Sequence, residues 1–315
     1  NVFFSPLGVS TMLSMALLGT EGRAADNIRK VLHLDELDEQ SALHEFMSYR
    51  TLLQRLGSED DKTEAVYIAT KLFLDDDNLP KSSYEEDSVK YYSSVPEVVD
   101  FSKEKVARKR INQWVKDELE DAYMSDMVEQ DQLDTRETKA VLVNAMTFKG
   151  TWREKFRRDY TRDFDFHRGL EDKINCQVMI QHRVPYKVTY SNDLNAQLIE
   201  VPYAGDKLTM VLLVPTKVGG LPEAERLLKY HTIDEIREYA TEITTDFFLP
   251  KFKLEVTHSL KEILRSLGLK NTFVPGNAEM SSLSTNKDLA ISAVLQQAVL
   301  EIDEEGMLGP YETVP

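Results

Sequence analysis

The side chains that could do chemistry are few in this sequence and stand far apart. Its six histidines occupy positions 33, 44, 167, 182, 231 and 258, without an HExxH motif or a Cys/His cluster at zinc spacing. The sequence also has no GxSxG nucleophile elbow, no Walker loop and no GxGxxG motif. Ser5 has no base near it, and its hydroxyl is expected to bond the backbone ahead of Pro6. The sequence therefore predicts no catalytic residues, no metal site and no cofactor.

The single cysteine and the charged runs have equally simple interpretations. Cys176 cannot form an internal disulfide and is expected to be an inert buried thiol. The acidic runs at 58–61 (SEDD) and 75–78 (DDDN) are typical of solvated loops. Calcium is the alternative, although the spacing and the terminal Glu of an EF-hand are missing. The basic stretch Lys103–Arg110 is diluted by Glu104, which favours a solvated helix face over a polyanion site.

Composition excludes several partner classes. The 315 residues are 42% hydrophobic, which is enough for one large domain or two ordinary ones with a sizeable core. Thirty-eight basic residues against 54 acidic ones give a net charge of −16, which argues against non-specific nucleic-acid or anionic-membrane binding. No apolar run approaches transmembrane length. The chain starts at Asn1 without an initiator Met or signal peptide, so its N-terminus is expected to be trimmed.

Apolar periodicity places helices early and strands late. Val9–Leu18 has helical spacing and ends at Gly19, Ser102 is expected to cap a second helix, and Thr257 is expected to open a third. The apolar stripes of the last two are Ala107, Ile111, Trp114, Val115 and Leu119, and then Leu260, Ile263, Leu264 and Leu267. Strand-like runs are Lys139–Lys149, Gln197–Tyr203, Leu208–Val214, Thr244–Phe252 and Ile291–Asp303, with a hairpin turn at Ala204-Gly205-Asp206. This order favours an α+β fold over a regular βαβ alternation.

Several long motifs resemble those of the serpins in order and spacing. They are NVFFSPLGVSTMLSMALLGTEG, VLVNAMTFKGTW with Phe156, LIEVPYAGDKLTMVLLVP, FLPKFKLE, LGLKNTF and AVLEIDEEG. The resemblance covers nearly the whole chain. It implies an α+β fold with three β-sheets, surrounding helices and an exposed reactive-centre loop, in a single domain over residues 1–315. Such a chain would lack its extreme N-terminus and the C-terminal segment that follows the loop.

The resemblance also implies a function. A serpin loop is attacked by a protease, forms a covalent acyl-enzyme and traps it by inserting as a new strand in the largest sheet. The hinge here would be Glu304, Glu305 and Gly306. The partner is then a serine or cysteine protease that brings its own nucleophile, and the inhibitor is not an enzyme. We expect a monomer that binds neither nucleic acid nor membrane. An extracellular location is expected, with an intracellular one left open.

Two amides interrupt apolar strand faces. Gln296 belongs to the alternating set Val294, Gln296, Ala298, Leu300 and Ile302, and Asn144 lies in the run from Ala140 to Phe148. Serpins place an Asn and a His at these positions, bonded beneath the point where the large sheet opens. With Ser5, Asn144 and Gln296 would form this sheet-opening network, and Gln in place of His would remove any pH sensitivity. The alternative is that both amides only bond local backbone. Trp152 is expected near the point where the loop first enters, or else as a core aromatic.

The loop departs from the inhibitory pattern. Inhibitory serpins follow the hinge with Thr or Ser and a run of small residues. Here the loop is Met307, Leu308, Gly309, Pro310, Tyr311, Glu312, Thr313, Val314 and Pro315. Insertion would turn Tyr311 inward, and the two prolines lack the N–H that a central strand uses. Two functions therefore stay open: a protease inhibitor, with inefficient loop insertion, and a non-inhibitory serpin with a carrier, chaperone or signalling role.

Overall fold

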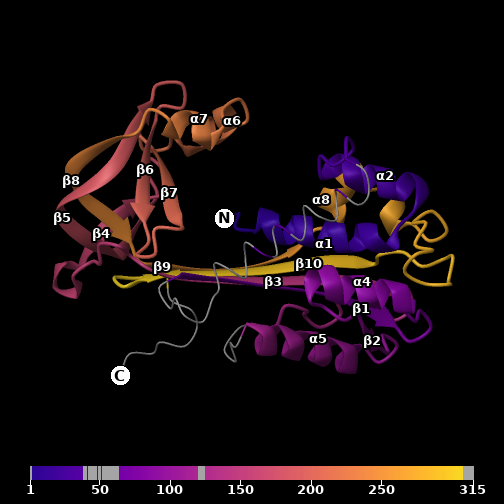
Figure 1. The fold of residues 1–315 in the computed structure, drawn as a ribbon. Coiled ribbons are helices and arrows are strands. Elements are labelled where there is room, and N and C mark those ends of the chain that lie inside the picture. The colour runs from indigo at the N-terminus through magenta and orange to yellow at the C-terminus, as the bar shows by residue number, and fades with distance from the viewer. Residues whose placement is uncertain are drawn as a thin grey trace. The chain divides into compact units, whose positions relative to one another are not determined.

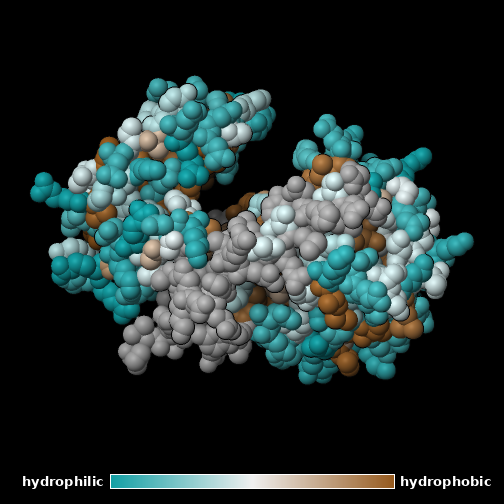
Figure 2. Space-filling model, in the orientation of Figure 1, coloured by the Kyte–Doolittle hydropathy of each residue, from teal (hydrophilic) through white to brown (hydrophobic). Residues whose placement is uncertain are grey.

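The structure, a computed structural model, describes residues 2–37, 41, 48, 51, 64–119 and 125–307. The chain divides into two compact units (Figure 1), and the described residues on the face drawn in Figure 2 are mostly hydrophilic. The first comprises Asn1–Gly57, Val66–Thr147 and Leu254–Val299, and the second comprises Ser58–Ala65, Phe148–Lys253 and Leu300–Pro315. The expectation of a single domain over residues 1–315 stays a prediction.

A six-stranded sheet has the strand order β2-β1-β3-β11-β10-β9. Its strands are β1 (Glu64–Asp75), β2 (Glu97–Val99), β3 (Ala140–Thr151), β9 (Phe252–Ser259), β10 (Ala293–Ile302) and β11 (Gly306–Met307). β3 and β10 pair directly and in parallel, from Val141 opposite Ala293 to Thr147 opposite Val299. The short β11 pairs with both strands only beyond this range.

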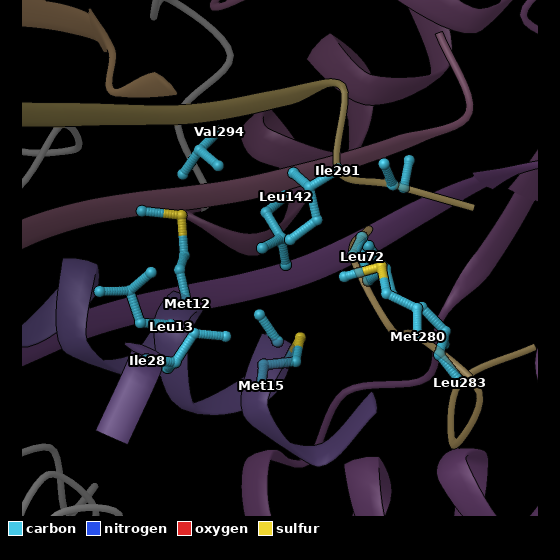
Figure 3. Close-up of a cluster of buried hydrophobic side chains, with 14 of the residues drawn as sticks. Met12, Leu13, Met15, Ile28, Leu72, Leu142, Met280, Leu283, Ile291 and Val294 are labelled. Carbon is cyan, nitrogen blue, oxygen red and sulfur yellow. The ribbon is translucent and has the colours of Figure 1, made fainter. Parts of the chain in front are cut away.

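Helices of the first unit cover both faces of this sheet. They are α1 (Pro6–Gly19), α2 (Gly22–Val31), α4 (Ser82–Tyr92), α5 (Glu104–Glu118), α8 (Lys261–Ser266) and the 3-10 turn η2 (Asn271–Phe273). Successive strand residues point to opposite faces. Leu142 of β3 packs with α1 and α2 in one buried cluster, whereas Val141 and Val143 pack with α5 in another. Figure 3 shows the first cluster, in which Met12, Leu13 and Met15 of α1 lie near Ile28, Leu142 and Val294.

The second unit is built on a five-stranded sheet of order β4-β5-β6-β7, with β8 paired to β5. Its elements are η1 (Arg158–Tyr160), β4 (Arg162–His167), β5 (Lys173–Ser191), β6 (Ala196–Pro202), β7 (Thr209–Pro215), α6 (Leu221–Leu228), α7 (Ile233–Arg237) and β8 (Thr241–Pro250). β6 and β7 form the hairpin predicted around Ala204-Gly205-Asp206. The fold is α+β, as expected. The described strands give two hydrogen-bonded sheets rather than three, because the 19-residue β5 pairs with β4 in its first half and with β6 in its second.

Two predicted helix starts are wrong. Ser102 donates its hydroxyl hydrogen bond to Asp100, so α5 begins one residue later, with Lys103 at the N-cap. Thr257 lies in strand β9, and α8 begins only after Leu260. The predicted stripe of this helix is half right, because Leu260 and Leu264 are buried while Ile263 and Leu267 are 53% and 59% exposed. No helix among the described residues is long and apolar enough to cross a membrane.

The buried cluster of Figure 3 provides a matched test of the first unit's core. Leu142 is fully buried between α1 and β10, so Leu142→Ala is expected to lower the free energy of unfolding by about 2–5 kcal/mol. Leu267→Ala removes the same atoms from an exposed position and is expected to stay within about 0.5 kcal/mol of the unchanged protein. Urea denaturation measures both, and equal losses would contradict this assignment of the core.

Candidate functional site

Two buried amides meet within the β3–β10 pairing. Asn144 of β3 and Gln296 of β10 are register partners, and both side chains are fully buried. Nε2 of Gln296 donates to Oδ1 of Asn144 at 2.8 Å. The structure thus places the two polar interruptions of apolar strand faces in direct contact, across the boundary between the strands.

The other polar atoms of both amides also have partners. Nε2 of Gln296 donates to the carbonyl oxygen of Ser5 at 3.0 Å, and the backbone N–H of Ser5 donates to Oε1 of Gln296 at 2.9 Å. Nδ2 of Asn144 donates to Oγ1 of Thr70 at 2.9 Å and to the carbonyl oxygen of Ala69 at 3.2 Å. These bonds fix which end of each amide is oxygen and which is nitrogen. The network therefore links β1, β3 and β10 to the start of α1.

The start of α1 fits closely over this network. Oγ of Ser5 accepts the N–H of Gly8 at 3.0 Å, so the predicted role of the Ser5 hydroxyl in bonding backbone is confirmed. A Cβ at Gly8 would overlap Oδ1 of Asn144 and lie 2.7 Å from Nε2 of Gln296. Only glycine lets the helix approach the paired amides this closely.

After β10 the chain makes a tight turn and comes back as β11. Oδ1 of Asp303 accepts the N–H groups of Glu305 and Gly306 at 2.8 and 3.2 Å, and the N–H of Asp303 donates to Gly306 at 2.9 Å. Gly306 then lies opposite Thr151 of β3, and Met307 lies opposite both Gly150 of β3 and Ile302 of β10. The first two residues after the turn therefore already occupy the space between the ends of β3 and β10.

A pair of glycines makes this close packing possible. Gly306 has φ +149°, a conformation that side chains with a Cβ rarely adopt, and a Cβ there would overlap the carbonyl oxygen of Gly150. A Cβ at Gly150 would in turn lie 2.7 Å from the ring of Phe148 and 2.8 Å from that of Tyr203. The backbone of β11 and the aromatic side chains beneath it leave no room for a larger residue at either position.

Glu304 anchors the turn from a buried position. Its carboxylate, 5% exposed, accepts hydrogen bonds from Nζ of Lys251 and from Oγ1 of Thr161, both at 2.7 Å. Its carbonyl oxygen accepts the N–H of Phe156 at 2.9 Å. Burial raises the pKa of this carboxyl, but the hydrogen bonds from Lys251 and Thr161 outweigh burial and leave the pKa below the ordinary value of 4.5. The anchor is therefore a charged carboxylate at neutral pH.

Trp152 forms the floor beside the turn. Its indole N–H donates to the carbonyl oxygen of Asp303 at 2.9 Å, and its backbone N–H donates to that of Glu305 at 2.9 Å. The ring is 1% exposed and stacks on Tyr203 with 4.7 Å between centroids. The expectation of a core aromatic is confirmed, and Trp152 also bonds Asp303 and Glu305, whereas a position at the entry point of the loop stays a prediction.

Comparison with known proteins shows the family of this chain. A model of the family described as "Serpin (serine protease inhibitor)" matches residues 1–313. The chain belongs to the serpin family. Leukocyte elastase inhibitor from Xenopus laevis is 33% identical to this serpin over 312 residues, which are 97% of this chain and 80% of the relative.

Solved serpin structures agree with this assignment. Serpin48, described as a highly specific serpin of the insect Tenebrio molitor, has a TM-score of 0.88 and 25% identity, covering 99% of this chain and 82% of that one. Thyroxine-binding globulin in complex with thyroxine has a TM-score of 0.89 at 24% identity, covering 100% and 83%, and shows likeness of fold alone.

The structure brings the site residues predicted for this serpin into two groups. Ser5, Asn144 and Gln296 form the buried network of the first unit. Glu304 and Glu305 lie in the turn in the second unit, and Gly306 and Met307 form β11. The other loop residues, Leu308, Gly309, Pro310, Tyr311, Glu312, Thr313, Val314 and Pro315, lie outside the described residues.

Several partners of these residues carried no signal that sequence reasoning could use. Thr70 and Gly8 complete the amide network, while Lys251, Thr161 and Gly150 hold the hinge. Each is an ordinary residue type whose importance comes from a neighbour far away in the chain. Among them, only Thr70 leaves a weak local signal, because it interrupts an apolar strand face.

The acidic run 75–78 has a structural explanation in this serpin. The carboxylate oxygens of Asp75, Asp76 and Asp77 lie within 4.8 Å of one another. Asp75 is buried and accepts hydrogen bonds from Nζ of Lys139 at 2.6 Å and from the N–H of Phe101 at 3.3 Å. Asp75 is therefore an ion-paired, buried strand residue rather than part of a solvated loop, whereas Asp76 and Asp77 are exposed. The run 58–61 lies outside the described residues, and Cys176 is only partly buried, unlike the prediction.

Replacing Gly306 tests whether the hinge is held as the structure shows. Gly306→Ala is expected to release β11, because the new Cβ overlaps Gly150 and the backbone angle becomes strained. Hydrogen exchange at residues 306 and 307 should then speed up at least about tenfold, the factor that about 1.4 kcal/mol gives. Gly268→Ala is the control, since its φ of +115° is strained too but no atom lies within 4 Å of the added Cβ. Unchanged exchange in Gly306→Ala would contradict the docked hinge.

The pKa of Glu304 predicts a pH-dependent anchor. Because its pKa is lower in the folded protein than in the unfolded one, the carboxylate stabilises the fold above pH 4.5, and this is lost as the pH falls through the folded pKa. The stability difference between the unchanged protein and Glu304→Gln should therefore be largest near neutral pH and shrink below pH 4.5. Urea denaturation across a pH series measures it. A difference that stays constant down to pH 3 would show that Glu304 does not carry the effect.

Proposed function

We propose that this serpin inhibits a serine or cysteine protease by offering the loop after Gly306 as bait and inserting the cut loop between β3 and β10. The observation that carries the proposal is β11. Gly306 and Met307 pair with β3, and Met307 also pairs with β10, which supports an insertion that starts from this point. The protease brings the nucleophile, in keeping with a site built of hydrogen-bonded amides and a hinge.

Further insertion requires β3 and β10 to separate along their whole direct pairing. Asn144 and Gln296 are joined across this boundary by one side-chain hydrogen bond, and each amide keeps its other partners on its own side. Gln296 stays bonded to Ser5, and Asn144 stays bonded to Thr70 and Ala69. We propose that the network divides here, so that opening costs about the 1–3 kcal/mol of a buried group left briefly without its partner.

The residues that follow Met307 are expected to hinder insertion. Pro310 and Pro315 lack the N–H of a central strand, and Tyr311 would turn a large ring and a hydroxyl inward, next to Gly309 and Thr313. Each lost hydrogen bond costs about 1–3 kcal/mol. Every ~1.4 kcal/mol that such losses add to the barrier of insertion slows insertion tenfold. Trapping competes with hydrolysis of the acyl-enzyme. We therefore propose an inhibitor that is partly consumed as a substrate.

The same loop residues favour a second function. If insertion is too slow to compete, the protein keeps the serpin fold without the trap and acts as a carrier, chaperone or signalling protein. We propose the inhibitor as the first function, because β11 pairs with β3 and β10 where the proposed insertion would begin.

Location and assembly are further proposals. With one cysteine and no internal disulfide, the chain can fold in either a reducing or an oxidising compartment. We propose a secreted monomer, with an intracellular protein as the alternative. Detection of the protein in medium or in cell lysate, and its mass in solution, decide between them.

Loop cleavage provides the test. The unchanged protein is expected to melt at a clearly higher temperature once the loop is cut, and to form covalent complex with a stoichiometry of inhibition above one. Replacing Gly309, Pro310 and Tyr311 by Ala, with Met307→Thr, should lower that stoichiometry, because small residues remove the hindrance.

A panel of serine and cysteine proteases, read on denaturing gels, supplies the measurement. A one-to-one stoichiometry in the unchanged protein would contradict the hindrance. Absence of both complex and melting shift, even in the alanine variant, would replace the inhibitor by the second function.

A further inference from the structure

A segment that follows α5 lies across the face of the sheet opposite α1. Met127, Val128 and Leu133 are buried in the cluster that contains Val143 of β3 and Leu295 of β10. Asn112 of α5 bonds this segment twice, by donating to the carbonyl oxygen of Val128 at 3.0 Å and accepting its N–H at 2.9 Å. The segment is thus fixed to α5 and packed over the boundary between β3 and β10.

A second group of polar contacts ties the start of this segment to β9 and β10. Nε2 of Gln297 lies 3.2 Å from the carbonyl oxygen of Ser125, 3.4 Å from its Oγ and 3.3 Å from Oε1 of Glu255. The same carboxylate oxygen accepts the N–H of Ser125 at 2.8 Å and the Ser125 hydroxyl. Ser125, Gln297 and Glu255 are called the outer clamp below.

The outer clamp and the Asn144–Gln296 network lie on opposite faces of one strand. Gln296 and Gln297 are neighbours in β10, so their side chains point to opposite faces. Both are fully buried. Gln296 has every polar group bonded, whereas Oε1 of Gln297 is without a partner among the residues that the structure describes. A buried acceptor of this kind weakens the clamp relative to the inner network.

Insertion of a strand would break either the contacts of the outer clamp or the bonds between the crossing segment and Asn112. A new strand between β3 and β10 moves β10 and β9 away from β3 by about 4.8 Å, the spacing between strands. Ser125 then loses Gln297 and Glu255 if its segment stays with α5 and β3. If the segment instead follows β10, its bonds to Asn112 are lost. The contacts of the segment with Asn112 and its contacts with Gln297 and Glu255 therefore cannot both survive insertion.

We infer that the outer clamp slows loop insertion and so helps to decide whether an attacking protease is trapped or released. This inference rests on the proposed function. Ser125, Gln297 and Glu255 act as positioning residues, because they bond one another and so hold β9 and β10 in place through the crossing segment. Loosening the clamp should favour the trap.

Three variants test the inference. Gln297→Met keeps the length of the side chain without its polar atoms, Glu255→Gln removes the charge, and Ser125→Ala removes the hydroxyl. Each is expected to raise the insertion rate at least about fivefold, the factor that about 1 kcal/mol gives, and to lower the stoichiometry of inhibition. Glu262→Gln is the matched control, since this carboxylate is 79% exposed on α8, and it should leave the rate unchanged. The insertion rate is measured as the time course with which the melting temperature rises after loop cleavage.

The double variant Ser125→Ala with Gln297→Met separates a shared contact from general loosening. If the two residues act through one clamp, the double variant gains less than the product of the single effects. A full product would mean that each change acts independently and would overturn the clamp.

The outcomes separate the inference from the proposed function. If the unchanged protein inserts its loop and the three variants insert at the same rate, the clamp inference is wrong while the function stands. If the unchanged protein does not insert, the proposed function fails, and hydrogen exchange of β10 in the uncut protein becomes the readout. Faster exchange of β10 in Gln297→Met than in Glu262→Gln then supports the clamp, and equal exchange overturns it.

Discussion

The direct pairing of β3 with β10 is the constraint on which the rest of this serpin depends. The register that places Asn144 opposite Gln296 also sets which residues of β3 face α1 and which face α5. A shift by one residue would turn every side chain of the shifted strand to the other covered face and would separate Asn144 from Gln296. The two amides therefore act as a register mark, since a buried amide without its partner costs more than a misplaced apolar side chain.

The same pairing makes the hinge understandable. In the second unit Gly306 and Met307 lie between the ends of β3 and β10, where the proposed insertion would begin. The turn before them is held by a buried ion pair, by backbone bonds to Trp152 and by two glycines that allow close backbone contact. These contacts hold β11 in place and, under the proposed function, set the point from which the cut loop inserts. In that mechanism the energy for the remaining steps comes from the new strand pairing.

The sequence predicted the parts of this arrangement that leave a local trace. Asn144 and Gln296 each break an apolar alternation, and the resemblance to the serpins then predicted that they are bonded to each other. Lys251 and Glu304 left no such trace, because an ion pair between residues 53 positions apart is not visible in periodicity. Thr257 was misplaced because the apolar spacing of Leu260 and Leu264 extends a helix pattern backwards into a strand. Strand β5 was missed because its first residues are exposed on both faces and a bulge between Gln181 and Val184 interrupts its alternation.

The central claim is that β3 and β10 part to admit the cut loop, and the distance across the sheet of the first unit measures this most directly. Spin labels at Tyr67 of β1 and Thr257 of β9 lie at exposed positions on the two sides of the boundary. Electron–electron double resonance before and after loop cleavage reports their separation. The account predicts that the separation grows by about 5 Å, the width of one added strand. An unchanged separation after complete cleavage would contradict it.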